Sequence, residues 1–384
     1  MKVLLEGFRL ARQQDTGGVD SYWRKLLPRL LDQAGDDVQF KILSAFLKPS
    51  RARALEPYRR AGAVLRHWWA APQWLEAAGR IGLRAEWLAG GHDLVHAVEP
   101  VWKLRGRARV VVTLHDLMYH HCPQFLDPRW VARLENGTIE LARRAAYWIC
   151  VSAHSRDDLV REFSIPRGRT AVVHHGVDAS FHSAGDDPAS AADARGQLGL
   201  GARPYLLFLG SVEPKKNLGV LLDAYGAALE RGLQADLVVA GRAGWRSELV
   251  TNAAAAAPAL RERVRFLGFV DQDLLPGLVA GARALVLPSR YEGFGMPVLE
   301  AMAAGTPVLC SHRGALPEVA GGAARLFDPD DDDGLAGLLQ EIDQDAALRD
   351  TLRAAGRERA RPFTWERCAG ETLQAYRNAL ELPA

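Results

Sequence analysis

Residues 282–305 read ARALVLPSRYEGFGMPVLEAMAAG, and this stretch predicts a strand, a glycine turn and a helix. The run ALVLP is short and apolar, which is typical of a buried strand in a parallel sheet. Pro297 suits the first helical position, because its φ is already helical and its missing N–H would be unpaired there anyway. The helix is expected to stop near Gly305. The apolar run, Pro297 and Gly305 together predict one strand–turn–helix unit of an α/β domain.

The turn itself indicates a site for a phosphate or diphosphate. Gly293 and Gly295 let the backbone approach a ligand closely, and the free N–H groups of the following helix favour an anion. Glu292 and Glu300 flank this turn on either side. Each has a plain structural explanation as well: Glu300 favours the helix dipole, and Glu292 is a surface residue.

A second loop strengthens the anion interpretation. FLGSVEPKKNL, residues 208–218, is a strand followed by Gly210 and two lysines. Lys215 and Lys216 would lie at the carboxyl end of their strand, where doubly wound sheets bind ligands. A lysine there can neutralise a phosphate as a point charge. The alternative is a pair of solvated loop lysines.

Apolar runs of this kind alternate with helical segments along the whole chain, which predicts α/β domains with parallel sheets. The residue count of 384 suggests two of them. The expected strands of the first domain lie within residues 1–7, 93–98, 109–116, 146–152 and 170–176. Those of the second lie within residues 204–211, 235–241, 263–270 and 282–289.

The domain boundary is expected within residues 178–204, which are rich in Ala, Asp, Gly and Ser. We therefore assign residues 1–182 to an N-terminal domain and residues 183–364 to a C-terminal domain. A helix at about 365–384 is expected to return to the first domain. Two doubly wound, Rossmann-like domains that face each other would form a cleft, which is a common place for a small-molecule site.

The first half carries weaker site signals. Gly17 and Gly18 precede an amphipathic helix, although glycine pairs often only make turns. His115 ends a strand, where it could hydrogen-bond a substrate hydroxyl or merely satisfy a loop carbonyl. His120 and His121 follow, but their spacing does not define a metal triad. SAHSRDDL predicts a helix cap by Ser155, with Asp158 three residues on.

Composition excludes several classes of protein. Net charge is +2, so no global field selects nucleic acid. The four cysteines are scattered without a CxxC pair, which argues against a structural zinc site or a disulfide framework. No apolar run approaches the roughly 18 residues of a spanning helix, and MKVLLEGFRLARQ lacks the apolar core of a signal peptide. A cytoplasmic protein is therefore expected.

Charge is uneven along the chain, however. Residues 48–87 contain eight basic and three acidic residues, with Trp68, Trp69, Trp74 and Trp87 among them. Basic residues mixed with aromatics can dock on an anionic membrane, which would place the protein at its inner face. The alternative is a pair of ordinary helices with a solvated basic face and a tryptophan core.

Several of these motifs together resemble a known family. EGFGMPVLE resembles the E-x7-E motif of retaining family 4 glycosyltransferases, which have the GT-B fold. GSVEPKKNL, AGRAGW, VRFLGFV and LPEVAGGAARLFDPDD resemble the nucleotide-sugar domain of that family in order and spacing. TGGVDSYWRKLLPRL, VTLHDL and VSAHSRDDL resemble its acceptor-side domain. The resemblance runs from about residue 15 to residue 376, with a gap over residues 40–90.

The resemblance implies a role for each motif residue. Glu300 would hold the ribose diol, and Glu292 would contact hydroxyls of the donor sugar. Lys216, helped by Lys215, would stabilise the leaving diphosphate, and His115 would touch the sugar near the reacting carbon. The remaining donor-binding positions are Gly17, Gly18, Gly210, Gly293, Phe294, Gly295, Met296 and, at the base, Val270. The family often has arginine at position 215 and leucine at position 296, and both departures are mild.

We therefore expect a glycosyltransferase that retains anomeric configuration and strictly needs no metal or other cofactor. The subgroup resembles bacterial mannosyltransferases of surface-polysaccharide synthesis, which suggests GDP-mannose as donor and a glycan or lipid-linked acceptor. UDP-sugars are the main competing donors. A sugar-nucleotide epimerase of similar fold and a non-catalytic glycan-binding protein are also compatible with these motifs.

Overall fold

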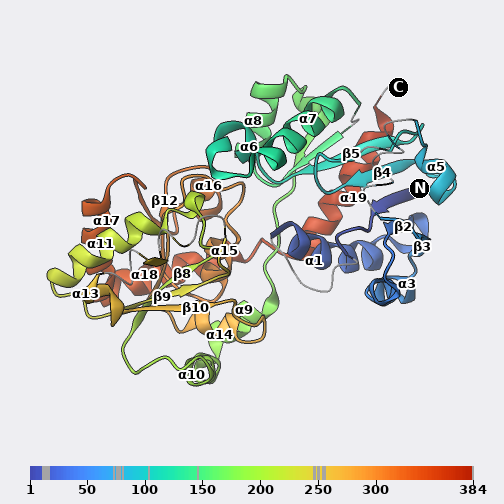
Figure 1. Cartoon of the computed structure of the whole chain (residues 1–384). Coiled ribbons are helices and arrows are strands. Elements are labelled where there is room, and N and C mark those ends of the chain that lie inside the picture. The colour runs from blue at the N-terminus through green and yellow to red at the C-terminus, as the bar shows by residue number, and fades with distance from the viewer. Residues whose placement is uncertain are drawn as a thin grey trace. The chain divides into compact units, whose positions relative to one another are not determined.

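The computed structural model describes residues 1–10, 18–71, 74, 79, 82–102, 104–144, 147–244, 248, 251–252 and 257–382 (Figure 1). The chain forms two compact units. The first comprises residues 1–121, 127–176 and 364–384, and the second comprises residues 122–126 and 177–363. The chain thus leaves the first unit after Gly176, a few residues before the expected boundary, and re-enters it at Thr364.

Within its described residues, the first unit contains a seven-stranded sheet of order β3-β2-β1-β4-β5-β6-β7, and every neighbouring pair is parallel. The strands are β1 (Lys2–Glu6), β2 (Gln39–Ala45), β3 (Val64–Trp68), β4 (Leu94–Ala97), β5 (Arg109–Leu114), β6 (Tyr147–Cys150) and β7 (Thr170–Val172). Sequence reasoning missed β2 and β3, which extend the sheet on one side.

Helices cover this sheet, because strands that are apolar on both faces must be shielded from water on both faces. The longer ones are α1 (Gly18–Gln33), α7 (Pro128–Arg144), α8 (Ala153–Phe163) and α19 (Trp365–Glu381). Shorter ones are α2 (Pro49–Arg53), α3 (Glu56–Arg60), α5 (Ala85–Ala89) and α6 (Met118–His121). The C-terminal helix α19 packs on α1 and on β5 and β6, so the expected return to the first domain is confirmed (Figure 1).

The second unit repeats the same plan. Its described residues form a six-stranded parallel sheet of order β10-β9-β8-β11-β12-β13. The strands are β8 (Tyr205–Leu209), β9 (Asp236–Ala240), β10 (Val264–Gly268), β11 (Ala284–Leu287), β12 (Val308–Ser311) and β13 (Arg325–Phe327). The last two were not expected. The principal helices are α9 (Ala179–Asp186), α10 (Pro188–Gln197), α11 (Leu218–Glu230), α13 (Pro258–Arg261), α14 (Leu275–Ala280), α15 (Met296–Ala303), α16 (Leu316–Ala320), α17 (Asp332–Gln344) and α18 (Ala346–Ala360).

Both sheets are doubly wound. In each, the strand order runs outward from the first strand, returns, and continues on the other side with the fourth. The order therefore reverses between β1 and β4 in the first unit and between β8 and β11 in the second. Such a switch point, at the carboxyl ends of the strands, is where open α/β sheets bind ligands. The expected fold class of two Rossmann-like domains is confirmed.

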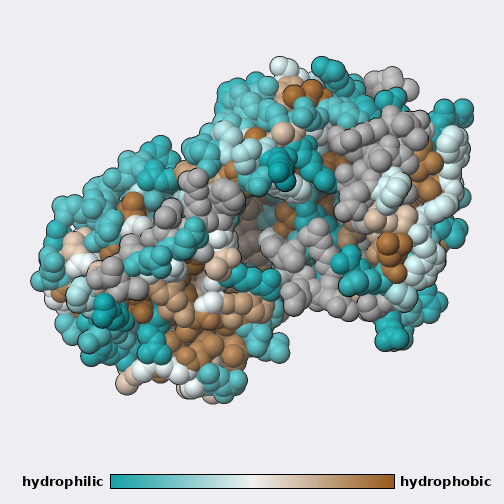
Figure 2. All heavy atoms as spheres, in the orientation of Figure 1, coloured by the Kyte–Doolittle hydropathy of each residue, from teal (hydrophilic) through white to brown (hydrophobic). Residues whose placement is uncertain are grey.

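The tryptophan core considered for residues 48–87 is wrong. Trp68, Trp69, Trp74 and Trp87 are 41%, 61%, 72% and 67% exposed, because β3 is an edge strand and α5 is a single short helix beside it. Figure 2 shows pale and brown surface among hydrophilic residues on the side of the first unit where β2 and β3 lie. Over the described residues, no helix is both long and apolar enough to cross a membrane.

Candidate functional site

Lys216 and Glu292 meet at the switch point of the second unit. Lys216 lies in the loop after β8 and Glu292 in the loop after β11, and these two strands are neighbours in the sheet. The Lys216 ammonium donates to Glu292 Oε1 at 2.5 Å, with both side chains about nine-tenths buried. Sequence reasoning assigned both residues to a donor site without placing them in contact.

The backbone after β8 delivers Lys216 to this position. Gly210 has φ +147° and turns the chain, and a side-chain Cβ there would lie 3.4 Å from the Cε of Lys216. A short 3-10 turn, Pro214–Lys216, follows, and Asn217 adopts a left-handed conformation before α11 begins. Asn217 is held there by a bond from its amide to the Pro329 carbonyl at 2.8 Å. The lysine is therefore fixed by its loop and is not a solvated tail.

Glu292 is held by a second donor from its own loop. The Ser289 hydroxyl donates to Glu292 Oε1 at 2.7 Å, and Ser289 is in turn fixed through its carbonyl, which accepts from the Ser311 hydroxyl at 2.5 Å. Burial alone would raise the pKa of Glu292, but the charges of Lys216 and Lys215 outweigh it and hold that pKa below its ordinary value. Glu292 is therefore an anion at neutral pH.

The pair still has hydrogen-bonding groups that could bind a ligand. Among the described residues, Glu292 Oε2 has no hydrogen-bond partner, and only one of the three ammonium protons of Lys216 is used. A carboxylate oxygen accepts from hydroxyl groups, and an ammonium donates to phosphate oxygens. The pair can therefore bind a polyol and an anion side by side.

The glycine turn beside this pair opens α15. Gly295 stands at the N-cap with φ +100°, and a Cβ there would lie 2.5 Å from the Leu316 side chain, so only glycine fits. Met296 begins the helix, and half-buried Glu300 follows one turn later. Gly293 and Phe294 are buried before the turn. The eight-residue helix thus presents its N-terminus at the switch point, as the sequence predicts.

Two further predicted residues of this unit lie near the same edge of the sheet. Lys215 pairs with Glu213 at 3.4 Å and adds to the positive charge that acts on Glu292. Val270 is buried just after β10, the outermost strand on that side. Next to it, the Arg242 guanidinium lies 4.3 Å from the centre of the half-exposed Phe269 ring.

His115 lies in the first unit, just past the carboxyl end of β5. The backbone of Val98 hydrogen-bonds its imidazole, while Nε2 is shielded from solvent and has no partner among the described residues. Burial, together with the charge of Arg9, lowers the pKa of His115 to about 3. The ring is therefore neutral, and the pattern assigns the proton to Nδ1 and a free lone pair to Nε2. Its Nδ1–H satisfies a loop carbonyl, and its Nε2 can accept a hydrogen bond from a hydroxyl group.

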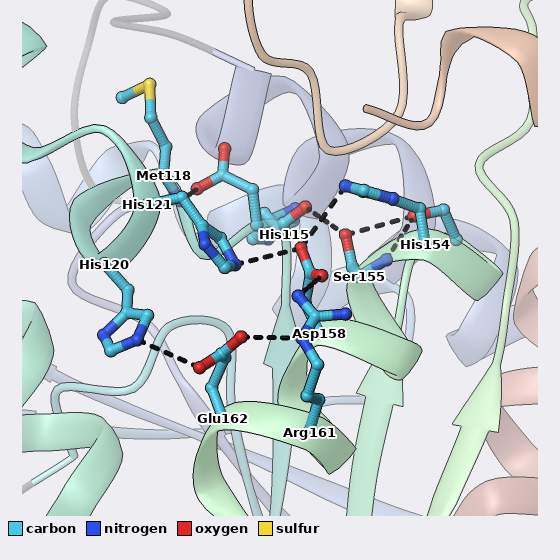
Figure 3. Close-up of polar contacts among 11 residues, drawn as sticks. His115, Met118, His120, His121, His154, Ser155, Asp158, Arg161 and Glu162 are labelled. Carbon is cyan, nitrogen blue, oxygen red and sulfur yellow. Dashed lines mark hydrogen bonds and ion pairs between the residues drawn. The ribbon is translucent and has the colours of Figure 1, made fainter. Parts of the chain in front are cut away.

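Beside His115, carboxylates hold the neighbouring histidines (Figure 3). His121 and His154 both approach Asp158 Oδ2, at 3.2 and 3.3 Å, and Arg161 pairs with the same carboxylate. Ser155 donates to the His115 carbonyl at 3.3 Å and is not the helix cap that the sequence suggested. The cap is Ser152, whose hydroxyl accepts from the Ser155 N–H at 3.0 Å.

The glycine pair of the first half is only partly described. Gly18 is exposed and begins α1. Apart from its chain neighbours and the adjoining backbone of α1, no atom of the described residues lies within 4 Å of the point that a Cβ would occupy there. Gly17 lies outside the described residues. In the part of the chain that the structure describes, no three His, Cys, Asp or Glu side chains are grouped so as to hold a metal ion.

Sequence reasoning missed an ion-pair cluster at the switch point of the first unit. Arg9 follows β1 and pairs with Glu99, which follows β4, and with Asp20 of α1 at 2.7 Å. Burial alone would lower the pKa of Arg9, but the carboxylates of Glu99 and Asp20 outweigh this effect and hold the pKa above its ordinary value. The first unit thus joins its first and fourth strands by a cation and a carboxylate, as the second unit does. Only the strand order could have revealed this.

Two family models match the chain. The model described as Glycosyl transferases group 1 matches residues 191–359, and the model described as Glycosyltransferase Family 4 matches residues 16–181. The first match covers the loops of Lys216 and Glu292, and the second covers Gly18 and His115. Each match therefore contains the candidate residues of one unit.

Individual proteins agree with these matches. The chain is 34% identical over 276 residues to O-antigen chain mannosyltransferase B of Escherichia coli, which is 70% of each sequence. Sucrose-phosphate synthase of Thermosynechococcus elongatus superposes with a TM-score of 0.73 at 23% identity, over 98% of both chains. Anabaena HepE in complex with UDP-glucose gives a TM-score of 0.72 at 18% identity, over 97% of this chain and 99% of that one. At these identities, the two structural similarities show the fold alone.

Proposed function

Because the chain belongs to the group 1 and family 4 glycosyltransferases and has their GT-B fold, we propose that it transfers mannose from GDP-mannose to a glycan or lipid-linked acceptor. The proposed sugar and the polysaccharide setting rest on the similarity to the O-antigen mannosyltransferase. The observation that carries the donor site is the buried pair of Lys216 and Glu292 beside the N-terminus of α15.

The pair suits a sugar diphosphate because the two halves of that ligand need opposite partners. The free protons of Lys216 and the first N–H groups of α15 would bind the diphosphate, and Glu292 Oε2 would accept from a sugar hydroxyl. Lys216 also neutralises Glu292, so the carboxylate does not repel the phosphates. Glu300, one turn along α15, would accept from the two ribose hydroxyls.

We further propose that the reaction retains configuration by attack on the same face as the leaving group. The bond from the anomeric carbon to the phosphate oxygen breaks, and its electron pair stays with the diphosphate. The acceptor oxygen forms the new bond, and its proton passes to the departing diphosphate. Lys216 stabilises the charge that develops there. Glu292 is a poor nucleophile for a covalent intermediate. Lys216 and Ser289 occupy its Oε1, the charge of Lys216 lowers its pKa, and the proposed sugar hydroxyl would occupy its Oε2.

His115 would contribute a neutral hydrogen bond to the donor sugar. A buried nitrogen without a partner costs free energy, and a sugar hydroxyl that donates to Nε2 would remove that cost. With Lys216 and helical N–H groups on the diphosphate, the proposed chemistry has no step that requires a divalent metal.

Residues 48–87 are proposed to contact an anionic membrane surface, where a lipid-linked acceptor would lie. The support is the exposure of Trp68, Trp69 and Trp87 next to basic residues of the same stretch. Tryptophan is favoured at the headgroup level of a bilayer, and each basic residue near anionic lipid adds about 1 kcal/mol. Such a surface would place the first unit at the membrane.

A donor panel tests the proposal. Thermal unfolding is measured with GDP-mannose, GDP, UDP-glucose and UDP, because a ligand at 100 times its Kd stabilises by about 2.7 kcal/mol. Stabilisation by the guanine nucleotides and release of GDP with acceptor are expected. Stabilisation by UDP-glucose, with none by GDP-mannose or GDP, would show that the donor is a UDP-sugar and not GDP-mannose. Isomerised nucleotide sugar without acceptor would indicate an epimerase, and binding without any turnover would indicate a non-catalytic protein.

A further inference from the structure

Aromatic rings of two other segments, Tyr22 and His175, lie against the imidazole of His115. The Tyr22 ring, on α1, stands edge-on to it with centroids 4.9 Å apart. The His175 ring stacks on it with centroids 5.8 Å apart and planes 25° apart. Tyr22 and His175 also contact each other at 4.8 Å. Both are buried, at 2% and 6% exposure, so these rings form a packed group beneath His115.

Each of these rings is anchored on its far side. The Tyr22 hydroxyl lies 3.4 Å from the hydroxyl of Thr113, in β5, the strand that His115 follows. The same Thr113 hydroxyl lies 2.7 Å from His96 Nε2. His175 contacts the Trp365 ring at 5.9 Å. These anchors lie in β4, β5 and the first residue of α19, so the group is fixed to the core of the first unit.

His175 also stands where the chain is about to leave the first unit. The next residue, Gly176, is pressed against the start of α19: a Cβ there would lie 2.2 Å from the Trp365 nitrogen, so only glycine fits. On the following step, the Val177 N–H donates to the Phe363 carbonyl at 3.0 Å. The outgoing and returning segments are therefore bound together beside His175, which gives its ring a defined position.

We propose that His175 and Tyr22 are positioning residues that orient the imidazole of His115 toward the donor sugar. This inference rests on the proposed function, because it concerns the same reaction. A single hydrogen bond, to the Val98 backbone, would leave the imidazole free to tilt about that contact. Rings packed on its face and edge remove this freedom. A displacement of about 1 Å at a reacting group can cost about 100-fold in rate.

Substitutions that keep or remove the ring separate positioning from chemistry. His175→Phe keeps a planar ring, so its kcat should stay within about threefold of the parent, whereas His175→Ala should lose about 10- to 100-fold. Donor KM should change little in both. Tyr22→Phe and Tyr22→Ala should behave in the same way. Phe40→Ala removes a buried ring of β2 away from this group, so it should lower thermal stability without lowering kcat per folded molecule.

A double-mutant cycle gives the decisive comparison. If His175 acts through His115, then adding His175→Ala to His115→Ala should cause no further loss of kcat. Additive losses, or equal losses in His175→Phe and His175→Ala, would overturn the inference. The ring signals of His115 in an NMR spectrum provide a readout without turnover: they should move in His175→Ala and stay near their place in His175→Phe. Unchanged signals in both variants would also overturn it. If the signals move but His115→Ala keeps full activity, the proposed role of His115 has failed instead.

Discussion

Lys216 Nζ lies 2.5 Å from Glu292 Oε1, which joins the loops that follow two neighbouring strands at the switch point of the second sheet. The contact explains how a carboxylate can stand beside a proposed diphosphate site. Each residue satisfies the other in a place where an isolated charge would be costly. A substitution at either residue therefore changes the electrostatic environment of the other.

Lys216→Ala should lower kcat by about 100- to 1,000-fold, because the leaving diphosphate loses a preorganised cation in a shielded site. The same change leaves Glu292 without its main counter-charge, so the pKa of Glu292 should rise. Lys215→Ala is the matched control: Lys215 lies in the same turn but pairs with Glu213, and its removal should cost far less. Steady-state kinetics of both variants with one donor make the comparison. Equal losses in the two variants would contradict the assignment of Lys216.

Glu292→Gln and Glu300→Gln should differ in which kinetic constant they change. Glu292 is proposed to contact the reacting sugar, so its substitution should lower kcat. Glu300 is proposed to hold the ribose, so its substitution should raise donor KM by about 10- to 100-fold, with a smaller change in kcat. This is the factor in affinity that corresponds to the loss of one hydrogen bond to a charged group. Kinetics with the intact donor, and binding of the free nucleoside diphosphate, distinguish the two. Weakened nucleotide binding in Glu292→Gln alone would reverse the two roles.

The sequence predicted both α/β domains because most of their strands are continuous apolar runs. It missed β2, where Lys41 interrupts the run, although the structure buries this lysine with its ammonium bonded to the Ala89 and Gly91 carbonyls. It missed β3 and β13 because edge strands keep exposed residues, such as Arg66 and Leu326. Short patterns of this kind carry little signal without their sheet partners.

The site was predictable to a similar extent. From the glycine turns and the lysines at strand ends, the sequence correctly predicted that Lys216 and Glu292 lie at the carboxyl ends of their strands. Their contact depends on β8 and β11 being neighbours, which is a property of strand order and not of local sequence. The same holds for Arg9 and Glu99 in the first unit. For the same reason, the rings against His115 come from α1 and from the segment after β7, and Trp365 of α19 packs behind His175, so the group joins segments far apart in sequence.

The pH dependence of activity should lack a limb near pH 6.5 from His115. Burial and the charge of Arg9 lower its pKa to about 3, so the imidazole is neutral throughout the range from pH 5 to pH 8. A profile of kcat/KM against pH, compared with that of His115→Gln, measures this. If kcat/KM changed with an apparent pKa near 6.5 in the parent but not in His115→Gln, the imidazole of His115 would titrate in this range, and its proposed role as a neutral group would be wrong.

Stability of the first unit should fall as the pH drops below about 6.5. Burial lowers the pKa of His96 and of His115 to about 3 and that of His175 well below its ordinary value. The unfolded chain therefore binds more protons between these limits, so stability is fully present above pH 6.5 and is lost toward pH 3. Each histidine contributes up to about 1.4 kcal/mol per pH unit. Urea unfolding at pH 7.5, 6.5 and 5.5 tests the sign. His96→Gln should have the shallower dependence, and an equal slope would exclude His96 as a source.

Chelation of divalent metals should leave activity unchanged. The proposed leaving-group charge is met by Lys216 and by the N-terminus of α15, which do not depend on a metal ion. Initial rates are compared in excess EDTA, in added Mg²⁺ and in added Mn²⁺, with donor concentration held at KM. Loss of activity in EDTA that either ion restores would require a metal in the donor complex.

Membrane binding should depend on the exposed tryptophans and on lipid charge. Sedimentation with vesicles of neutral lipid alone, and with vesicles that contain about 30% anionic lipid, measures binding; only the second should retain the protein (about 1 kcal/mol per basic residue at the surface). Trp69→Ala and Trp87→Ala remove side chains that are 61% and 67% exposed, so they should weaken binding without loss of stability. Trp148→Phe, at a residue that is 1% exposed in β6, is the control that should leave binding unchanged. Binding that survives both exposed substitutions, or that ignores lipid charge, would show that residues 48–87 are not the docking surface.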